Sequence, residues 1–163
     1  MARKARTIDE LKEASNHLYY EYSMLTTVAK GLASGIAGQG PLLNALIESF
    51  VIHVRAVIDF LYANNPKSDD VIAEDFFDKL GDWTRDRPEM SQLLTQARRR
   101  AAKEVAHLTY ARLEVTPETK PWEFVQLERE ISAVFGIFLK KVDISKLGPL
   151  WFAAGEKQSE GGE

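Results

Sequence analysis

The residues best suited to chemistry lie in one stretch, Arg98–Tyr110, which reads RRRAAKEVAHLTY. Its composition favours a helix, and helical spacing puts four polar residues on one face: Arg100, Lys103, Glu104 and His107. A histidine can take up and return a proton near neutral pH, and an arginine can bind a phosphate and neutralise charge that develops on it. Together the two side chains could cleave RNA without a metal, with the ribose 2′-OH as nucleophile.

The same stretch also fits a purely structural role. His107 could be a hydrogen-bonded residue of the helix, with the arginines solvated on its surface. Judged on spacing alone, this structural interpretation is favoured over catalysis.

A second polar group interrupts the most apolar part of the chain. Arg55 and Asp59 have the spacing of a helical ion pair, and Glu48 or Ser49 could contact His53 in the same way. Buried charges are costly unless they are paired, so these side chains need partners or a cavity. The favoured interpretation is a buried network that fixes the register of the helix.

The alternative for this second group is a binding pocket. In that interpretation His53, Arg55 and Asp59 line a cavity shared with His107 and Tyr110. The predicted binding residues of the chain are then these three together with Arg99, Lys103 and Tyr110.

Three histidines on three predicted helices suggest a rival hypothesis. His17, His53 and His107 could hold a zinc-, nickel- or iron-like ion inside a bundle whose size is similar to that of DinB-like proteins. Those proteins place two histidines close together on one helix, and this chain has no HxxxH. Glu104–His107 is a single ExxH pair, whereas di-iron carboxylate bundles need two. We therefore predict no metal ligands and no cofactor.

The pattern along the chain predicts an all-α bundle of four long helices and a short one. Residues 1–154 are expected to form one domain, with a disordered tail over residues 155–163. The signals are a capping box, proline starts, glycine stops and apolar stripes of helical period. The predicted segments are a helix from Thr7, a helix over Leu42–Tyr62 with Pro41 in its first turn, a short helix Val71–Leu80 capped by Asp69 or Asp70, a loop over Asp82–Arg87, a long helix opened by Pro88, and a last helix over Trp122–Val142.

Composition limits the kinds of site that the protein can have and the cell compartments that it fits. The chain has 163 residues, a net charge of −3 and no cysteine, which excludes disulfides and thiolate metal sites and fits a cytoplasmic location. We expect no signal peptide and no membrane span, because polar residues interrupt the apolar run Pro41–Tyr62. Five acids over Asp69–Asp78 and six bases over Arg85–Lys103 could form paired helix faces or an acidic patch beside a basic one.

The spacing of Arg100 and His107 resembles the Rx4–6H motif of HEPN domains. The segment KEVAH is followed by a loop, a tryptophan and a last amphipathic helix. This order is similar to that of the abortive-infection branch of the family. The resemblance implies a homodimeric, metal-independent ribonuclease in which Arg100 contacts the scissile phosphate and His107 transfers protons. Family members often carry a polar residue after the arginine, where this chain has Ala101 and so lacks an orienting hydrogen bond.

The leading hypothesis is therefore a HEPN-like ribonuclease or RNA-acting component of a defence or toxin system. Its partners would be a second copy of the chain, RNA and an antitoxin-like protein. The alternative is a non-catalytic interaction or nucleotide-binding module whose patch Arg98–Lys103 contacts a partner.

Overall fold

The computed structural model describes residues 3–106, 110, 113, 116 and 121–152. It is mostly helical and has no strand among these residues, which confirms the all-α prediction. Three helices are long among the described residues; the predicted fourth forms α4 and continues as a π-helical segment to Ala106, beyond which the structure describes only single residues before residue 121. The elements are α1 (Ile8–Ala33), α2 (Pro41–Leu61), the 3₁₀ turn η1 (Ala73–Phe76), α3 (Asp82–Asp86), α4 (Gln92–Arg100), the π-helical segment η2 (Ala101–Ala106), α5 (Phe124–Lys141) and the 3₁₀ turn η4 (Ile144–Lys146).

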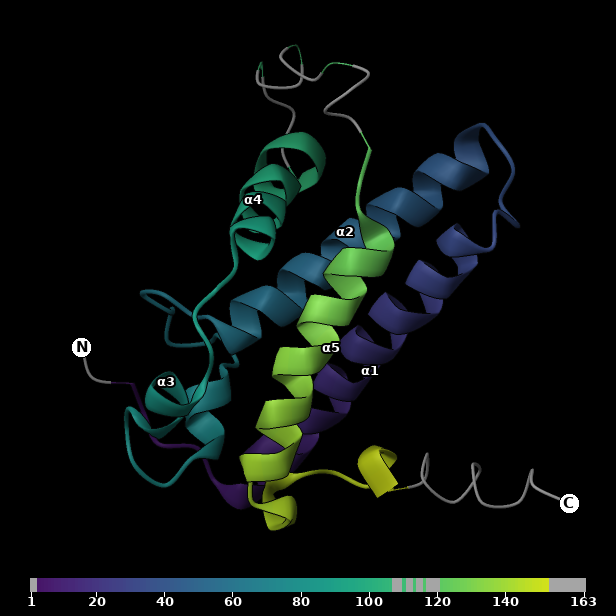
Figure 1. Ribbon diagram of the computed structural model, residues 1–163. Coiled ribbons are helices and arrows are strands. Elements are labelled where there is room, and N and C mark those ends of the chain that lie inside the picture. Colours follow the sequence, from purple (N-terminus) through teal and green to yellow (C-terminus); the bar gives the residue numbers. More distant parts are fainter. Residues whose placement is uncertain (1–2, 107–109, 111–112, 114–115, 117–120, 153–163) are drawn as a thin grey trace, which may run out of the picture.

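Local signals set the ends of the first two helices as predicted. Thr7 caps α1: its backbone N–H donates to the Glu10 carboxylate at 2.7 Å, and its hydroxyl accepts from the Glu10 N–H at 3.2 Å. Pro41 occupies the first turn of α2, after a turn in which Gly35, Gly38 and Gly40 adopt positive φ. These two helices form an antiparallel hairpin (Figure 1).

The core lies where α5 packs across the hairpin, while α4 packs against α2 alongside it (Figure 1). Phe138 of α5 is fully buried at the centre of an aromatic cluster. Its ring makes edge contacts with those of Phe60, Phe76 and Trp83, at centroid distances of 5.1, 5.8 and 5.7 Å. This cluster joins the second half of α2, η1 and α3 to α5.

Helix α2 is buried along its second half only. The buried residues run from Phe50 to Leu61, whereas Leu42 in the first turns is 63% exposed. By length and composition α2 could cross a membrane, a test that the core helices of soluble proteins also pass. Packing among the described residues gives no reason for the exposed apolar residues in the first half of α2.

The connection between α2 and α4 differs most from the sequence prediction. The predicted helix Val71–Leu80 is only the short turn η1, and the predicted loop Asp82–Arg87 contains α3. The reason is a distant cap: the Glu74 carboxylate accepts hydrogen bonds from the backbone N–H groups of Gly81, Trp83 and Thr84 at 2.6, 3.2 and 3.1 Å. Glu74 thereby starts α3 instead of extending its own helix.

The acidic segment pairs mainly with the chain termini rather than with the basic stretch. Arg3 donates to the Asp75 carboxylate at 2.9 Å and to the Asp70 carbonyl oxygen at 2.5 Å, and Arg6 donates to the Ser68 carbonyl. From the other end of the chain, Lys146 contacts Asp78 at 2.6 Å. The two predicted faces therefore do not pair with each other through these acids.

The segment after α5 is held against α1. The Gly148 N–H donates to the Ser15 hydroxyl at 2.7 Å, and the Trp151 indole N–H donates to the Ser15 carbonyl at 2.9 Å. A side chain at Gly148 would collide with Asn16 and would lie 2.7 Å from the Lys12 carbonyl oxygen. The close approach of these two backbones therefore requires glycine.

We expect Gly148→Ala to lower the free energy of unfolding by about 1–3 kcal/mol, because the added methyl overpacks this contact. Urea denaturation followed by circular dichroism would measure it. Gly136→Ala in α5 is the matched control: its added methyl meets nothing within 4 Å, and alanine there should raise stability by up to about 1 kcal/mol. Equal effects of the two substitutions would contradict the tight contact at Gly148.

Candidate ligand-binding site

Arg100, the predicted phosphate-binding residue, is held by other side chains. Its guanidinium donates twice to the Glu104 carboxylate, from Nε at 2.8 Å and from Nη2 at 3.0 Å. It lies 4.1 Å from the centroid of the Trp122 ring, and its Nη1 donates to the Pro121 carbonyl at 3.2 Å. A bidentate carboxylate and a stacked ring fix a guanidinium firmly. Arg100 therefore anchors the end of α4 to the start of α5.

Part of the face predicted for the arginine helix is present, because Arg100 and Glu104, four residues apart, contact each other. From Ala101 the chain follows a π-helix, whose wider turn changes the angular step per residue, and Ala101 itself is buried. Arg99, Lys103 and Tyr110 are exposed. His107 lies outside the described residues, so its predicted role in proton transfer stays a prediction.

His53 contacts α1 instead of the residues predicted for it. Its Nδ1 lies 2.7 Å from a carboxylate oxygen of Glu21, and the edge of its ring meets Tyr20 at a centroid distance of 5.8 Å. Neither Glu48 nor Ser49 is its partner. A step of two residues along a helix turns by about 200°, so His53 and Arg55 face different neighbours. Among the described residues His53 and Arg55 therefore share no contact, and the predicted pocket also requires His107, which lies outside them.

Arg55 and Asp59 do pair, as the spacing predicted, and a third residue completes the network. The Arg55–Asp59 distance is 3.4 Å, whereas Arg98 of α4 donates to the other oxygen of Asp59 at 2.6 Å. Asp59 therefore receives two arginines, and the Arg98 contact ties α4 to α2. The Arg55–Asp59 pair of the predicted buried network is present, but its side chains are 38% and 39% exposed, His53 is not part of it, and Arg98 is an additional member.

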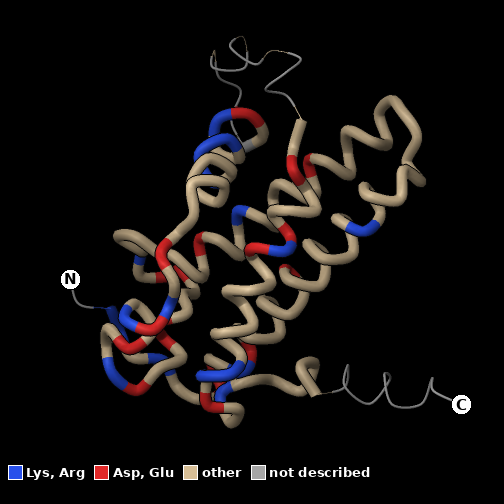
Figure 2. Tube along the Cα trace, viewed as in Figure 1, with Lys and Arg blue, Asp and Glu red and all other residues tan. Residues whose placement is uncertain are grey.

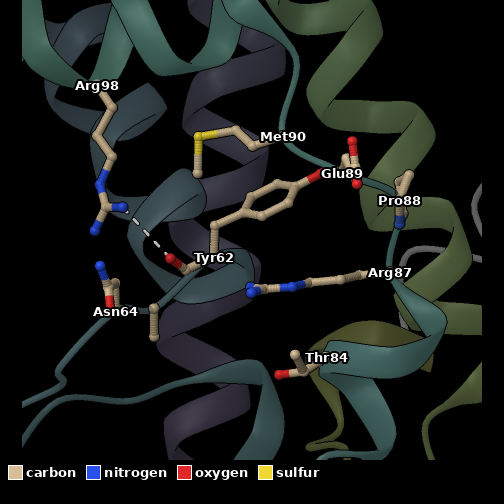
Figure 3. Close-up of a pocket in the computed structure, with 9 residues that line it drawn as sticks. Tyr62, Asn64, Thr84, Arg87, Pro88, Glu89, Met90 and Arg98 are labelled. Atoms are coloured by element: carbon tan, nitrogen blue, oxygen red, sulfur yellow. Dashed lines mark hydrogen bonds between the residues drawn. The ribbon is translucent and has the colours of Figure 1, made fainter.

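A cavity of about 420 Å³ lies at the end of α2, beside this network. Arg98 reaches it from α4 and Arg87 from the loop after α3, and both guanidinium groups point toward the end of α2 beside Asn64 (Figure 3). The rest of the wall is mixed in polarity and consists of Tyr62, Ala63, Thr84, Pro88, Glu89 and Met90.

The two arginines are positioned by the last carbonyl groups of α2, which have no donor within the helix. The Leu61 carbonyl accepts from the Trp83 indole N–H at 2.7 Å and from Arg87 Nη1 at 2.8 Å. Arg98 Nη1 lies 3.4 Å from the Tyr62 carbonyl. Cations are also favourable at the negative end of a helix dipole. The remaining N–H groups, Nη2 of Arg98 and Nε and Nη2 of Arg87, have no acceptor among the described residues.

Tyr62 forms the floor between the two arginines. The Arg87 guanidinium stacks over its ring at 4.9 Å from the centroid, and the residue is only 4% exposed. Its phenol oxygen is buried and has no hydrogen-bond partner in the described part of the chain. Burial raises the pKa of this phenol; Arg87 opposes the shift and Glu130 adds to it. An unpartnered hydroxyl at a cavity wall is a polar group that a ligand could satisfy.

Two smaller hollows continue from this cavity along α2. One of about 200 Å³ shares Ala63, Asn64 and Arg98 with it, and one of about 240 Å³ lies farther along, lined by Arg55 and Asp59 among apolar residues. Two of the predicted binding residues therefore line a hollow, although not the largest one.

Sequence reasoning missed the residues that form the main cavity. Arg87 is one of the six bases over Arg85–Lys103, and Tyr62 is the last residue of the predicted helix Leu42–Tyr62; neither is a predicted binding residue. A usable signal existed: a helix that ends in the core needs outside donors for its last carbonyls, and Trp83 and Arg87 are the donors of the next segment.

A metal centre finds no support in the part of the chain that the structure describes. No group of three histidine, aspartate or glutamate side chains there could hold an ion. Of the two described histidines, His17 is exposed and His53 is buried against Glu21.

Comparison with models of protein families, with curated proteins and with solved structures found no match for this chain. The function must therefore be argued from the site alone.

Because the Tyr62 phenol is buried without a partner, we expect Tyr62→Phe to leave the free energy of unfolding unchanged or to raise it by up to about 1 kcal/mol. The wild type should also lose stability as the pH rises above the ordinary tyrosine value of 10.0, because the unfolded chain then releases the proton more readily than the folded one. Urea denaturation at pH 7 and above pH 10 would compare the two proteins. A loss of stability in Tyr62→Phe at pH 7 would show that the hydroxyl has a partner.

Proposed function

We propose that the protein is a non-catalytic binding module for a small oxyanion-bearing molecule, such as a nucleoside monophosphate, held in the cavity at the end of α2. One observation carries the proposal: Arg87 and Arg98, from different elements, reach the same cavity with guanidinium N–H groups that the described residues leave without acceptors. Arginine suits this role because its planar fork matches carboxylate and phosphate oxygens.

Preorganisation supports the proposal. Trp83 fixes the segment that carries Arg87, and the 2.6 Å contact with Asp59 fixes Arg98. Both guanidinium groups are thus placed before a ligand arrives, which lowers the entropy that binding would cost. Each also retains donors that do not take part in these structural contacts.

The wall of the cavity indicates what else the ligand would carry. A volume of about 420 Å³ is in the range of small-molecule sites. Asn64 and Thr84 can donate or accept hydrogen bonds, whereas the Glu89 carboxylate accepts them and would repel a second anionic group nearby. We therefore expect a ligand with one anionic end and with hydroxyl or amine groups elsewhere.

Nucleotide binding is tested by titrating the protein with adenosine monophosphate and with inorganic phosphate, followed by calorimetry and by the rise in melting temperature. Arg87→Gln and Arg98→Gln should each weaken binding about tenfold to a hundredfold, because each removes charge-assisted hydrogen bonds. Arg99→Gln is the matched control, since Arg99 is exposed on the same helix as Arg98 and should leave binding unchanged.

Phosphate alone should bind more weakly than the nucleotide, because it would use the arginines but not the rest of the wall. Equal loss of affinity in all three variants would show that binding depends on the overall positive charge and not on Arg87 and Arg98 in particular. No binding of either compound, or of a carboxylate panel, by the folded wild type would contradict the proposal.

The ribonuclease hypothesis stays a separate prediction from the sequence. It requires Arg100 to exchange its bidentate contact with Glu104 for a phosphate. Cleavage of a mixed pool of labelled RNAs in EDTA, beside Arg100→Ala and His107→Ala, is the measurement. If this hypothesis holds, cleavage survives chelation and disappears in both variants, while Arg87→Gln retains it. We expect no cleavage, because Glu104 and Pro121 already occupy three N–H groups of Arg100.

A further inference from the structure

One face of α2 carries an uncharged stripe that the fold leaves accessible. Its members recur at alternating spacings of three and four residues, and we call them the α2 stripe: Leu42, Ala45, Ser49, Ile52 and Ala56. Leu42 and Ile52 are 63% and 55% exposed, Ala45 is exposed, and the other two are half-buried. This spacing is that of the seam along which two helices pack side by side.

The chain around the first half of the stripe is uncharged as well. No charged residue occurs between Lys30 and Glu48, and Figure 2 shows the turn between α1 and α2 without a blue or red segment. Contiguous exposed apolar surface of this kind marks an interaction site more often than chance exposure does.

We propose that the α2 stripe packs against the α2 stripe of a second copy, with the two helices antiparallel. In that arrangement Ser49 lies beside Ile52 of the second copy, and Ala45 lies beside Ala56. Small residues facing a branched one allow close approach of the two helices. The two-fold axis then passes between Ser49 and Ile52, so only residues in this part of α2 approach their own counterparts, and none of them is charged.

The charged residues beside the stripe favour an antiparallel arrangement of the two helices. Glu48 and Arg55 lie seven residues apart along the same edge of the stripe and have opposite signs. In an antiparallel pair this edge meets itself, so Glu48 of each copy lies near Arg55 of the other. Glu48 has no ion pair within the described residues, and the 3.4 Å contact between Arg55 and Asp59 leaves Arg55 able to turn toward a new partner.

A lipid surface would need different residues around the stripe. Helices that lie in a membrane interface are rich in lysine and arginine, and tryptophan and tyrosine are enriched there. None of these four residue types occurs from Gly31 to Ile52. The chemistry therefore favours a second copy over a membrane.

Sedimentation equilibrium of the full chain over a range of concentrations tests the proposal. The wild type should form a dimer, and Ile52→Glu should weaken association at least tenfold, because it places a carboxylate in the seam of both copies. Leu80→Glu is the matched control: Leu80 is 97% exposed and lies outside the stripe, so its replacement should leave the dimer intact. Circular dichroism would verify that each variant folds.

Charge reversal makes the test specific for the antiparallel arrangement. Glu48→Arg alone and Arg55→Glu alone should each weaken the dimer several-fold, and the double variant should restore it. A monomeric wild type, or a double variant weaker than either single one, would overturn the proposal. So would binding of the wild type, but not of Ile52→Glu, to phosphatidylcholine vesicles, which would assign the stripe to a membrane. Ile52→Glu and Glu48→Arg alter no residue of the cavity that Arg87 and Arg98 line, so with these two variants ligand binding can be measured separately from dimer formation.

Discussion

The carbonyl groups at the buried end of α2 are the constraint on which the middle of the chain depends. A helix that ends against other elements needs donors from elsewhere, because its last carbonyls have no partner within the helix. Here the indole of Trp83 and the guanidinium of Arg87 supply them, and Trp83 also fills the aromatic core beside Phe138. Trp83 thus donates a hydrogen bond to the end of α2 and also fills the apolar core. Both contacts fix α3, and α3 places Arg87 at the cavity.

Features that depend on neighbours in sequence could be predicted from the sequence. The capping box of Thr7 and Glu10, the proline that opens α2 and the pair of Arg55 with Asp59 all involve residues within four positions of each other. Such contacts form within one or two turns of a helix, whatever the rest of the chain does. The all-α class follows in the same way from helical periodicity along each segment.

Contacts between distant segments could not be predicted. The carboxylate of Glu74 ended one predicted helix and began another because it reached N–H groups seven to ten residues away. His53 found its partner on α1, since the packing of the hairpin decides which side of α2 faces Glu21. Asp59 gained Arg98 from across the bundle for the same reason. Each of these depends on tertiary packing, which overrides the nearest local partner.

The three consecutive arginines show why a run of charge is not yet a site. Neighbouring residues of a helix point about 100° apart, so the run is divided among different surroundings. Arg98 crosses to Asp59 and the cavity, Arg99 is exposed, and Arg100 stacks on Trp122 beside Glu104. The residue with the most suggestive spacing became a structural anchor, whereas Arg98 retains donors beside Arg87. Which arginine keeps donors toward a cavity thus depends on the helix end that it meets, and the motif spacing selects Arg100, which Glu104, Trp122 and Pro121 hold.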